Sequence, residues 1–332
     1  MSVENLGLVR LLHGGRTRKV PFWEPWFAMH DFCRRYYGDY SHIESRIAMA
    51  KDLGMDAVRL DVAARIDTNV HFVTRTSTTD KYVWYGGGSL RSLSQIEERG
   101  DVPNWDREIA QLQGERRLVA EAGLACWMVL PWCFHAIATS MGLERFALTL
   151  YDDFDFIDAA FEWVESRNRK AIDVAIKEIK PDFVLFDGDC AYKTGLMINP
   201  DMFRRLTFER TRETVSHLRG LGIPYTFHSD GKLDDVIPML IELGFSAVHG
   251  CEKAANDLDD LVHRFGGDIC LAGNMDVVFL SRATVEEVRR ETERMLEIGS
   301  QKGRFIAACN TSPMDYIPDE NYKAMADVIK HF

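Results

Sequence analysis

The segment His228-Ser229-Asp230-Gly231 follows an apolar run, and a second apolar run further along the chain ends in Cys309. An imidazole, a carboxylate and a thiol that meet at one point can bind a metal ion and leave one coordination position open. Zinc in catalytic sites is bound in this way. These residue types therefore predict a metal site formed by His228, Asp230 and Cys309.

The spacing of His228 and Asp230 supports this interpretation, because side chains at i and i+2 of an extended segment point to the same side. Each ligand also has an ordinary structural alternative. These are a core histidine bonded to a carbonyl, an aspartate that closes a turn, and a buried thiol that packs like a small apolar group. A metal bound by His228 with Glu252 or with Cys251 stays open as a second arrangement.

Most of the apolar runs end in groups that can ligate a metal or transfer a proton, which marks the strand ends as catalytic candidates. Asp187 and Asp189 follow a run that is expected to be buried, so they should contact solvent, a cation or a substrate. Tyr192 and Lys193, shortly after them, are suited to an anionic group. The candidates at strand ends are Glu24, Asp61, His135, Asp187, Asp189, His228, Asp230, His249, Glu252, Asn274, Asp276, Cys309 and Asn310.

Eight apolar runs alternate with helical patterns, which is typical of βα units around a parallel sheet. In 332 residues they predict a (β/α)8 TIM barrel. An open doubly wound sheet is the alternative, but no glycine-rich dinucleotide motif supports it. The fifth and eighth strands of a barrel lie across its mouth from each other, so a metal shared by their ends requires the loops to approach. The predicted strands span residues 20–27, 56–62, 125–133, 183–189, 225–231, 246–252, 270–276 and 304–311. The clearest helical segments span residues 202–222, 236–244, 284–299 and 319–332.

Two stretches interrupt the regular pattern. Residues 63–104 form an insertion after the second strand, with two segments typical of a β-hairpin followed by a helical pattern. Residues 134–156 look irregular. Active sites of barrels lie at the C-terminal ends of the strands, so we expect both stretches to line the mouth, and the insertion to cover a ligand there.

Composition narrows the class of partner. The net charge of −11 and the pI near 5.4 argue against nucleic-acid binding, which needs clustered Lys and Arg. No run is long and apolar enough for a membrane helix, the N-terminus lacks an export signal, and the seven scattered cysteines suit reduced thiols. A cytoplasmic protein that acts on a small molecule is expected. The oligomeric state stays open, with a homodimer among the options.

The C-terminal half resembles the uroporphyrinogen decarboxylase superfamily, whose members are (β/α)8 barrels. The resemblance rests on DGDCAYKTGLMINPDMFRR, on the run from GIPYTFHSDGK to DICLAGNMD, on TVEEVRR and on CNTSPMDYIPDENYKAM, and more weakly on RLLHGGRTRKVPFWE near the N-terminus. It implies that residues 1–332 form a single barrel domain of this family.

The superfamily contains decarboxylases and cobamide-dependent methyltransferases. The decarboxylases open with an arginine-rich segment that binds substrate carboxylates, whereas VPFWEPWFAMHDF has no arginine here. The methyltransferases typically bind zinc through His-x-Cys after the fifth strand and a Cys after the eighth. His228 and Cys309 match this pattern, and Asp230 replaces the first Cys. Because carboxylates also bind zinc, the resemblance implies either a site with a harder ligand set or the loss of the metal.

The resulting prediction is a zinc-dependent methyltransferase that moves a methyl group between a small substrate and cobalamin on a separate corrinoid protein. The substrate would be a methyl ether, a methylamine or a thiol. The alternatives are a metal-free decarboxylase-like lyase, with Asp61 or Asp189 stabilising a protonated pyrrole, and a non-catalytic corrinoid or tetrapyrrole carrier. The predicted catalytic residues are Asp61, Asp189, Glu252 and Asp276, and the predicted cofactor-binding residues are Tyr192 and Asn274. Aromatic residues expected near the mouth are Trp23, Trp26, Trp84, Trp132 and Tyr192.

Overall fold

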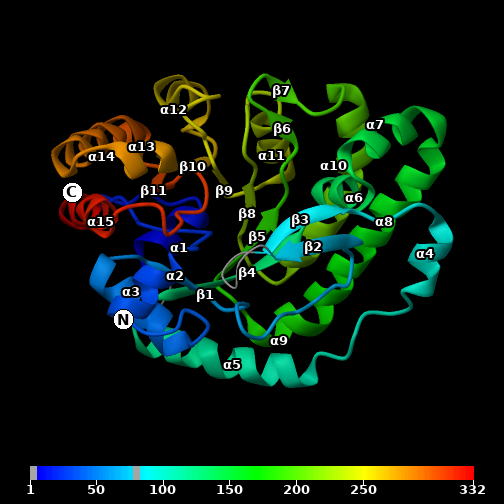
Figure 1. The fold of residues 1–332 in the computed structure, drawn as a ribbon, viewed down its shortest axis with the longest axis horizontal. Coiled ribbons are helices and arrows are strands. Elements are labelled where there is room, and N and C mark those ends of the chain that lie inside the picture. Colours follow the sequence, from blue (N-terminus) through cyan, green and yellow to red (C-terminus); the bar gives the residue numbers. More distant parts are fainter. Residues whose placement is uncertain (1–5, 78–82) are drawn as a thin grey trace.

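The computed structural model describes residues 6–77 and 83–332. Seven strands form one sheet, in which every pair of neighbours is parallel (Figure 1). Their order in the sheet is their order in the chain, as expected for successive βα units that curl into a barrel. The strands are β1 (Ala57–Arg59), β4 (Ala125–Pro131), β5 (Phe183–Asp187), β8 (Tyr225–His228), β9 (Ala247–His249), β10 (Cys270–Met275) and β11 (Phe305–Cys309).

The predicted first strand is an extended segment that joins the two edges of this sheet. On one side, the N–H of Trp23 donates to the oxygen of Ala307 at 3.0 Å, and the N–H of Ala307 donates to Pro21 at 2.8 Å. On the other side, the N–H of Asp56, just before β1, donates to Phe22 at 2.8 Å. The segment forms isolated bridges rather than a regular strand, since Pro21 has no N–H to donate. The predicted (β/α)8 architecture is therefore confirmed.

Helices surround the sheet, as Figure 1 shows. The helix predicted over residues 202–222 begins earlier, because the side chain of Asn199 caps the N–H groups of Asp201 and Met202. The helices are α1 (Gly7–Leu12), α2 (His30–Tyr36), α3 (Ile43–Leu53), α4 (Leu93–Glu98), α5 (Asp106–Glu121), α6 (Cys133–Met141), α7 (Leu143–Asp152), α8 (Phe154–Ala171), α9 (Lys177–Ile179), α10 (Pro200–Gly220), α11 (Ile237–Leu243), α12 (Leu258–Phe265), α13 (Val277–Arg282), α14 (Val285–Gly299) and α15 (Asp319–His331). Short turns of other helical types span η2 (Ile172–Ile176) and η3 (Ser300–Lys302). No helix in residues 6–77 and 83–332 could cross a membrane.

Aromatic rings fill the interior of the barrel. Trp23 contacts the rings of Trp127 and Phe183 edge-on, with centroids 5.5 and 5.1 Å apart, and Trp127 stacks on Phe183. All three side chains are fully buried, so the interior is a packed core. Active-site chemistry is therefore expected at the C-terminal ends of the strands.

The insertion after β1 contains the predicted hairpin, formed by β2 (Val73–Ser77) and β3 (Val83–Gly88), and it precedes α4. It packs on α6, where the hydroxyl of Tyr85 donates to the oxygen of Thr139 at 2.8 Å. Gly88 lies so close to the backbone of Ser140 that a Cβ would collide with it. The prediction for the second strand of this hairpin includes residues 81 and 82, which lie outside the described part of the chain. The side chain of Trp84 also lies outside it.

The stretch at residues 134–156 differs from the prediction, because α6, α7 and the start of α8 replace the expected irregular segment. Gly142, with φ +85°, separates α6 from α7. A backbone in this region suits glycine, which accounts for the break between two helical patterns. Each helix is too short to show a clear helical repeat of apolar residues in the sequence. Their residues nevertheless reach the mouth, as expected.

Candidate metal centre

Three ligand groups meet where β5 and β8 end. One atom each from Asp189, His228 and Asp230 can be chosen so that all three lie within 4.8 Å of one another. His228 Nε2 is 3.8 Å from Asp189 Oδ1 and 3.9 Å from Asp230 Oδ1. Since β5 and β8 are hydrogen-bonded neighbours, the two loops that follow them lie side by side. This arrangement is compatible with a bound metal ion.

Backbone contacts between the two loops fix the carboxylates. The N–H of Asp230 donates to Asp189 Oδ1 at 2.9 Å, and the N–H of Cys190 donates to Ser229 Oγ at 3.1 Å. Gly231 has φ +87°, and a Cβ there would collide with the backbone of the β5 loop. The structure therefore explains two further residues of the His-Ser-Asp-Gly segment. The serine links the two loops by a hydrogen bond, and the glycine permits their close approach.

The electrostatics of the group favour a cation. Burial raises the pKa of Asp230 to about 6, against the influence of His228, and the carboxylates of Asp189, Glu252 and Asp187 raise it further. Asp230 Oδ1 is buried and makes no hydrogen bond to any described residue. A buried carboxylate oxygen without a donor is costly unless a cation or a ligand satisfies it. The donor atoms thus fit a divalent metal.

A chain of two histidines orients the metal-facing nitrogen of His228. His249 Nε2 lies 3.0 Å from the carbonyl oxygen of Cys309, which can only accept, so this nitrogen carries the proton. Burial, together with His228, lowers the pKa of His249 well below its usual value, so its Nδ1 is a bare acceptor. His228 Nδ1 is 2.8 Å away and must donate to it. This leaves His228 Nε2, 3.8 and 3.9 Å from the two aspartates, as the nitrogen that would bind a metal.

Replacing His249 with Phe is expected to weaken metal binding by about 10- to 100-fold, because the partner that fixes the tautomer of His228 is lost. Phe keeps a ring against Trp23, whose centroid is 5.9 Å from that of His249. Competition with a chelator measures the affinity. His263→Phe, at an exposed position on α12, serves as the control. An unchanged affinity in His249→Phe would show that the second histidine does not orient the first.

The predicted ligand Cys309 lies in a different environment. Its carbonyl faces His249, whereas its N–H donates to both oxygens of Glu24 at 3.2 Å and its thiol also bonds that carboxyl. Burial and Glu24 raise the pKa of Cys309 well above its usual value. The hydroxyl of Tyr322 donates to Glu24 as well, at 3.2 Å. The sequence predicted Cys309 as the third ligand beside His228 and Asp230. Among the described residues, Asp189 lies in that position instead.

Replacing Glu24 with Gln is expected to stabilise the protein at alkaline pH. Burial raises the pKa of Glu24 to about 8, so between pH 4.5 and 8 the folded protein keeps a proton that the unfolded chain releases. The free energy of unfolding therefore falls as pH rises through this window. Gln removes this loss, which amounts to about 4 to 5 kcal/mol at pH 9. Denaturant unfolding at pH 4.5 and pH 9 measures it, with exposed Glu44→Gln as the control. Equal stabilities of Glu24→Gln and wild type at pH 9 would contradict this assignment.

A cavity of about 960 Å³ opens beside the metal ligands and extends under the insertion. The predicted role of residues 63–104 at the mouth is thus supported. Its residues in the cavity wall are Arg65, Ile66, Asp67, Thr68, Asn69, His71, Val73, Tyr85 and Arg99. Residues 134–156 contribute through His135, Ala138, Thr139 and Leu143. Asp61, Asp187 and Asp189 also line this cavity.

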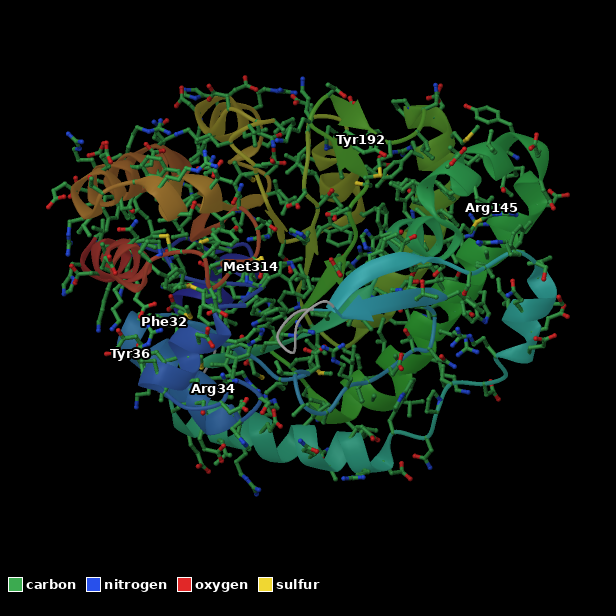
Figure 2. All side chains as sticks on the ribbon, viewed as in Figure 1. Phe32, Arg34, Tyr36, Arg145, Tyr192 and Met314 are labelled. Carbon is green, nitrogen blue, oxygen red and sulfur yellow. The ribbon has the colours of Figure 1, made fainter. Side chains whose placement is uncertain are left out.

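The remaining predicted residues are spread around the mouth. Glu252 accepts a hydrogen bond from the N–H of Gly231 at 3.2 Å and thus supports the Asp230 loop. Asp276 caps α13 through the N–H groups of residues 278 and 279, and buried Asn274 donates to the carbonyl of Cys251. Tyr192 is exposed, on the small hairpin of β6 (Ala191–Tyr192) and β7 (Gly195–Leu196) (Figure 2). Of these four residues, Glu252 contacts the loop that carries Asp230, through its hydrogen bond with Gly231.

The roles of two further residues, one behind the metal group and one in the cavity wall, could not be read from the sequence. His249 is one of the predicted candidates at strand ends, but its contact with His228 depends on the register of β8 with β9, in which the two are paired. Arg59 was not singled out. Its spacing from Asp61 is i and i+2, the same signal that linked His228 to Asp230, and it could have been found in that way.

Comparison with known proteins supports the fold and identifies the family. The family model described as uroporphyrinogen decarboxylase (URO-D) matches residues 117–332, which include the whole metal group. No curated protein gives a significant match to the chain. Among solved structures, a methyltransferase from Methanosarcina mazei is similar with a TM-score of 0.78 and 17% identity, covering 100% of this chain and 99% of that chain.

A B12-independent methionine synthase from Shewanella sp. W3-18-1, solved in complex with selenomethionine, is similar with a TM-score of 0.55 and 14% identity. The match covers 95% of this chain and 94% of that chain. At these identities the two structures establish a shared fold. The family match covers well over half of the chain and confirms the resemblance seen in the sequence. The protein belongs to the uroporphyrinogen decarboxylase family.

Proposed function

We propose that the protein is a zinc-dependent methyltransferase that moves a methyl group between a small substrate and the cobalt of a separate corrinoid protein. The observation that carries this proposal is the convergence of Asp189, His228 and Asp230 beside a cavity of about 960 Å³. Three ligands with an open position are the usual arrangement of catalytic zinc, and a small substrate fits the cavity. The overall similarity to a structure that is itself a methyltransferase supports the choice within the family.

The ligand set suits zinc, because imidazole nitrogen and carboxylate oxygen both bind it. Zinc at these ligands supplies Lewis acidity toward the heteroatom that carries or receives the methyl group. The protein contributes geometry. His249 fixes the tautomer of His228, and Glu252 holds the loop of Asp230 through Gly231. Cys309 remains the alternative third ligand that the family resemblance implies.

A decarboxylase-like lyase would use Asp61 or Asp189 to stabilise a cationic pyrrole. It is less well supported, because Asp189 belongs to the candidate ligand group. Asp61 is already neutralised, since its Oδ1 accepts from Arg59 Nε at 2.7 Å and its Oδ2 accepts from the N–H of Val129 at 3.2 Å. A carboxylate that is held by a guanidinium and a backbone donor has little capacity left for a second cation. This observation favours the methyltransferase.

The proposal is tested by incubating zinc-loaded protein with a reduced corrinoid protein and a panel of methyl ethers, methylamines and methyl thioethers. The cobalt absorbance spectrum reports methylation of the corrinoid. We expect methylation with at least one class of donor, and none with protein that has been stripped of zinc. Binding of the corrinoid protein without methylation by any donor would contradict the proposal and support the carrier.

A further inference from the structure

Arg59 is held rigidly in the inner wall of the cavity. It is the last residue of β1, and its Nε donates to Asp61 Oδ1 at 2.7 Å, while Asp61 is itself fixed by the backbone of β4. The side chain of Arg59 is 16% exposed, and it is part of the cavity lining. The guanidinium is therefore preorganised with one edge bound to protein.

Two indole rings fix the plane of this guanidinium. Arg59 Cζ lies 5.1 Å from the ring centre of Trp26 and 5.7 Å from that of Trp127, within the range of a cation–π contact. The ring of Trp26 also lies edge-on to His228, with centroids 5.8 Å apart. Arg59 and the metal ligand His228 thus contact the same indole. Arg59 and Asp189 of the metal group also line the same cavity, so a molecule in this cavity has access to both.

The outer edge of the guanidinium is open to the cavity. No described residue forms a hydrogen bond with either terminal nitrogen of Arg59. Arg99, which also lines the cavity, is occupied, because its terminal nitrogens donate to Asn69 Oδ1 and to the carbonyl of His71. A fixed guanidinium with free parallel N–H groups is the protein group best suited to bind a carboxylate in a bidentate manner.

We propose that Arg59 binds a carboxylate on the substrate, so that the methyl donor or acceptor is a carboxylic acid whose reacting heteroatom points to the metal ligands. This inference rests on the proposed function and narrows its substrate class. A methylammonium group is disfavoured, because Arg59 already occupies the indoles that would bind such a cation. Asp187 lines the same cavity and repels anions, so Arg59 has to offset this repulsion when a carboxylate binds.

The test compares matched pairs of ligands that differ only in charge. The pairs are methoxyacetate with 2-methoxyacetamide, 4-methoxybenzoate with 4-methoxybenzamide, and mercaptoacetate with 2-mercaptoacetamide. Dissociation constants are measured on the zinc-loaded protein by calorimetry, without any corrinoid protein. In at least one pair we expect the carboxylate to bind 10-fold or more tightly than its amide. Equal binding within every pair, or no binding of any carboxylate, overturns the inference.

Three variants test whether the preference for the carboxylate over its amide comes from Arg59. Arg59→Gln is expected to remove it, Arg59→Lys to retain part of it, and Arg145→Gln, on the outer helix α7 (Figure 2), to leave it unchanged. Zinc content and thermal melting establish that each variant is folded, and Arg59→Lys keeps a cation beside Asp61. A carboxylate preference that survives in folded Arg59→Gln also overturns the inference.

The outcome is separable from that of the proposed function. A carboxylate preference that depends on Arg59, in a protein that never methylates a corrinoid, supports the substrate class and contradicts the methyl transfer. Methylation from neutral donors alone, unaffected by Arg59→Gln, supports the transfer and contradicts the substrate class.

Discussion

His228→Ala is expected to lose its metal ion and to reduce methyl transfer by at least about 1,000-fold. His228 is the one nitrogen ligand of the group, and its Nε2 faces both carboxylates. Without it, two aspartates with neighbouring acidic groups remain, a set that binds zinc weakly and holds it in no defined geometry. Metal analysis after gel filtration and the corrinoid methylation assay measure the two effects.

The control for this variant is His263→Ala, which removes an exposed histidine from α12. It should retain both zinc and activity. Thermal melting of His228→Ala in the presence of chelator separates loss of metal from loss of fold. Retention of one zinc per chain by folded His228→Ala would contradict the proposed ligand set.

Asp189→Asn and Cys309→Ala are expected to differ strongly in metal affinity. Asp189 belongs to the ligand group, so its amide should weaken zinc binding by at least about 100-fold. The thiol of Cys309 bonds Glu24 instead, so its removal should change the affinity by less than about threefold. Chelator competition on both variants shows whether Asp189 or Cys309 is the third ligand.

The opposite result would be informative. Loss of zinc from Cys309→Ala with retention by Asp189→Asn would show that the ligand set implied by the family resemblance holds in solution. Asp182→Asn provides a matched control for the aspartate, because Asp182 directly precedes β5 and accepts from the N–H of Cys126.

Most of the architecture could be predicted because most of the apolar runs end in polar residues and are followed by a helix. The hairpin in residues 63–104 was also evident, since its two segments are rich in β-branched and aromatic residues. The helices α6 and α7 were not, because Gly142 breaks their pattern. The first strand was predicted in the right place, but Pro21 prevents regular pairing.

The metal group was predicted in part. His228 and Asp230 share a segment, so their spacing alone brings them together. The third ligand depends on which strand lies beside them. β5 pairs directly with β8, whereas two strands separate β8 from β11. Consecutive parallel strands are usually neighbours, so adjacency favoured Asp189 over Cys309 even before the side chains were placed.

The orientation of individual side chains was beyond the sequence. That His249 accepts from His228 while donating to the carbonyl of Cys309 follows from the packing of β8, β9 and β11 at one end of the barrel. Likewise, the open edge of Arg59 is visible only once its contacts with Asp61 and the two indoles are known. Both depend on long-range contacts that spacing does not encode.

The most direct test is a titration of zinc-free protein with zinc, in which the rate of corrinoid methylation and the bound metal are measured in parallel. The rate should rise linearly with bound zinc and reach its plateau at one zinc per chain, with no such rise in His228→Ala. Full methylation by the zinc-free protein, or a rate that stays at zero when one zinc is bound, would contradict a zinc-dependent methyltransferase.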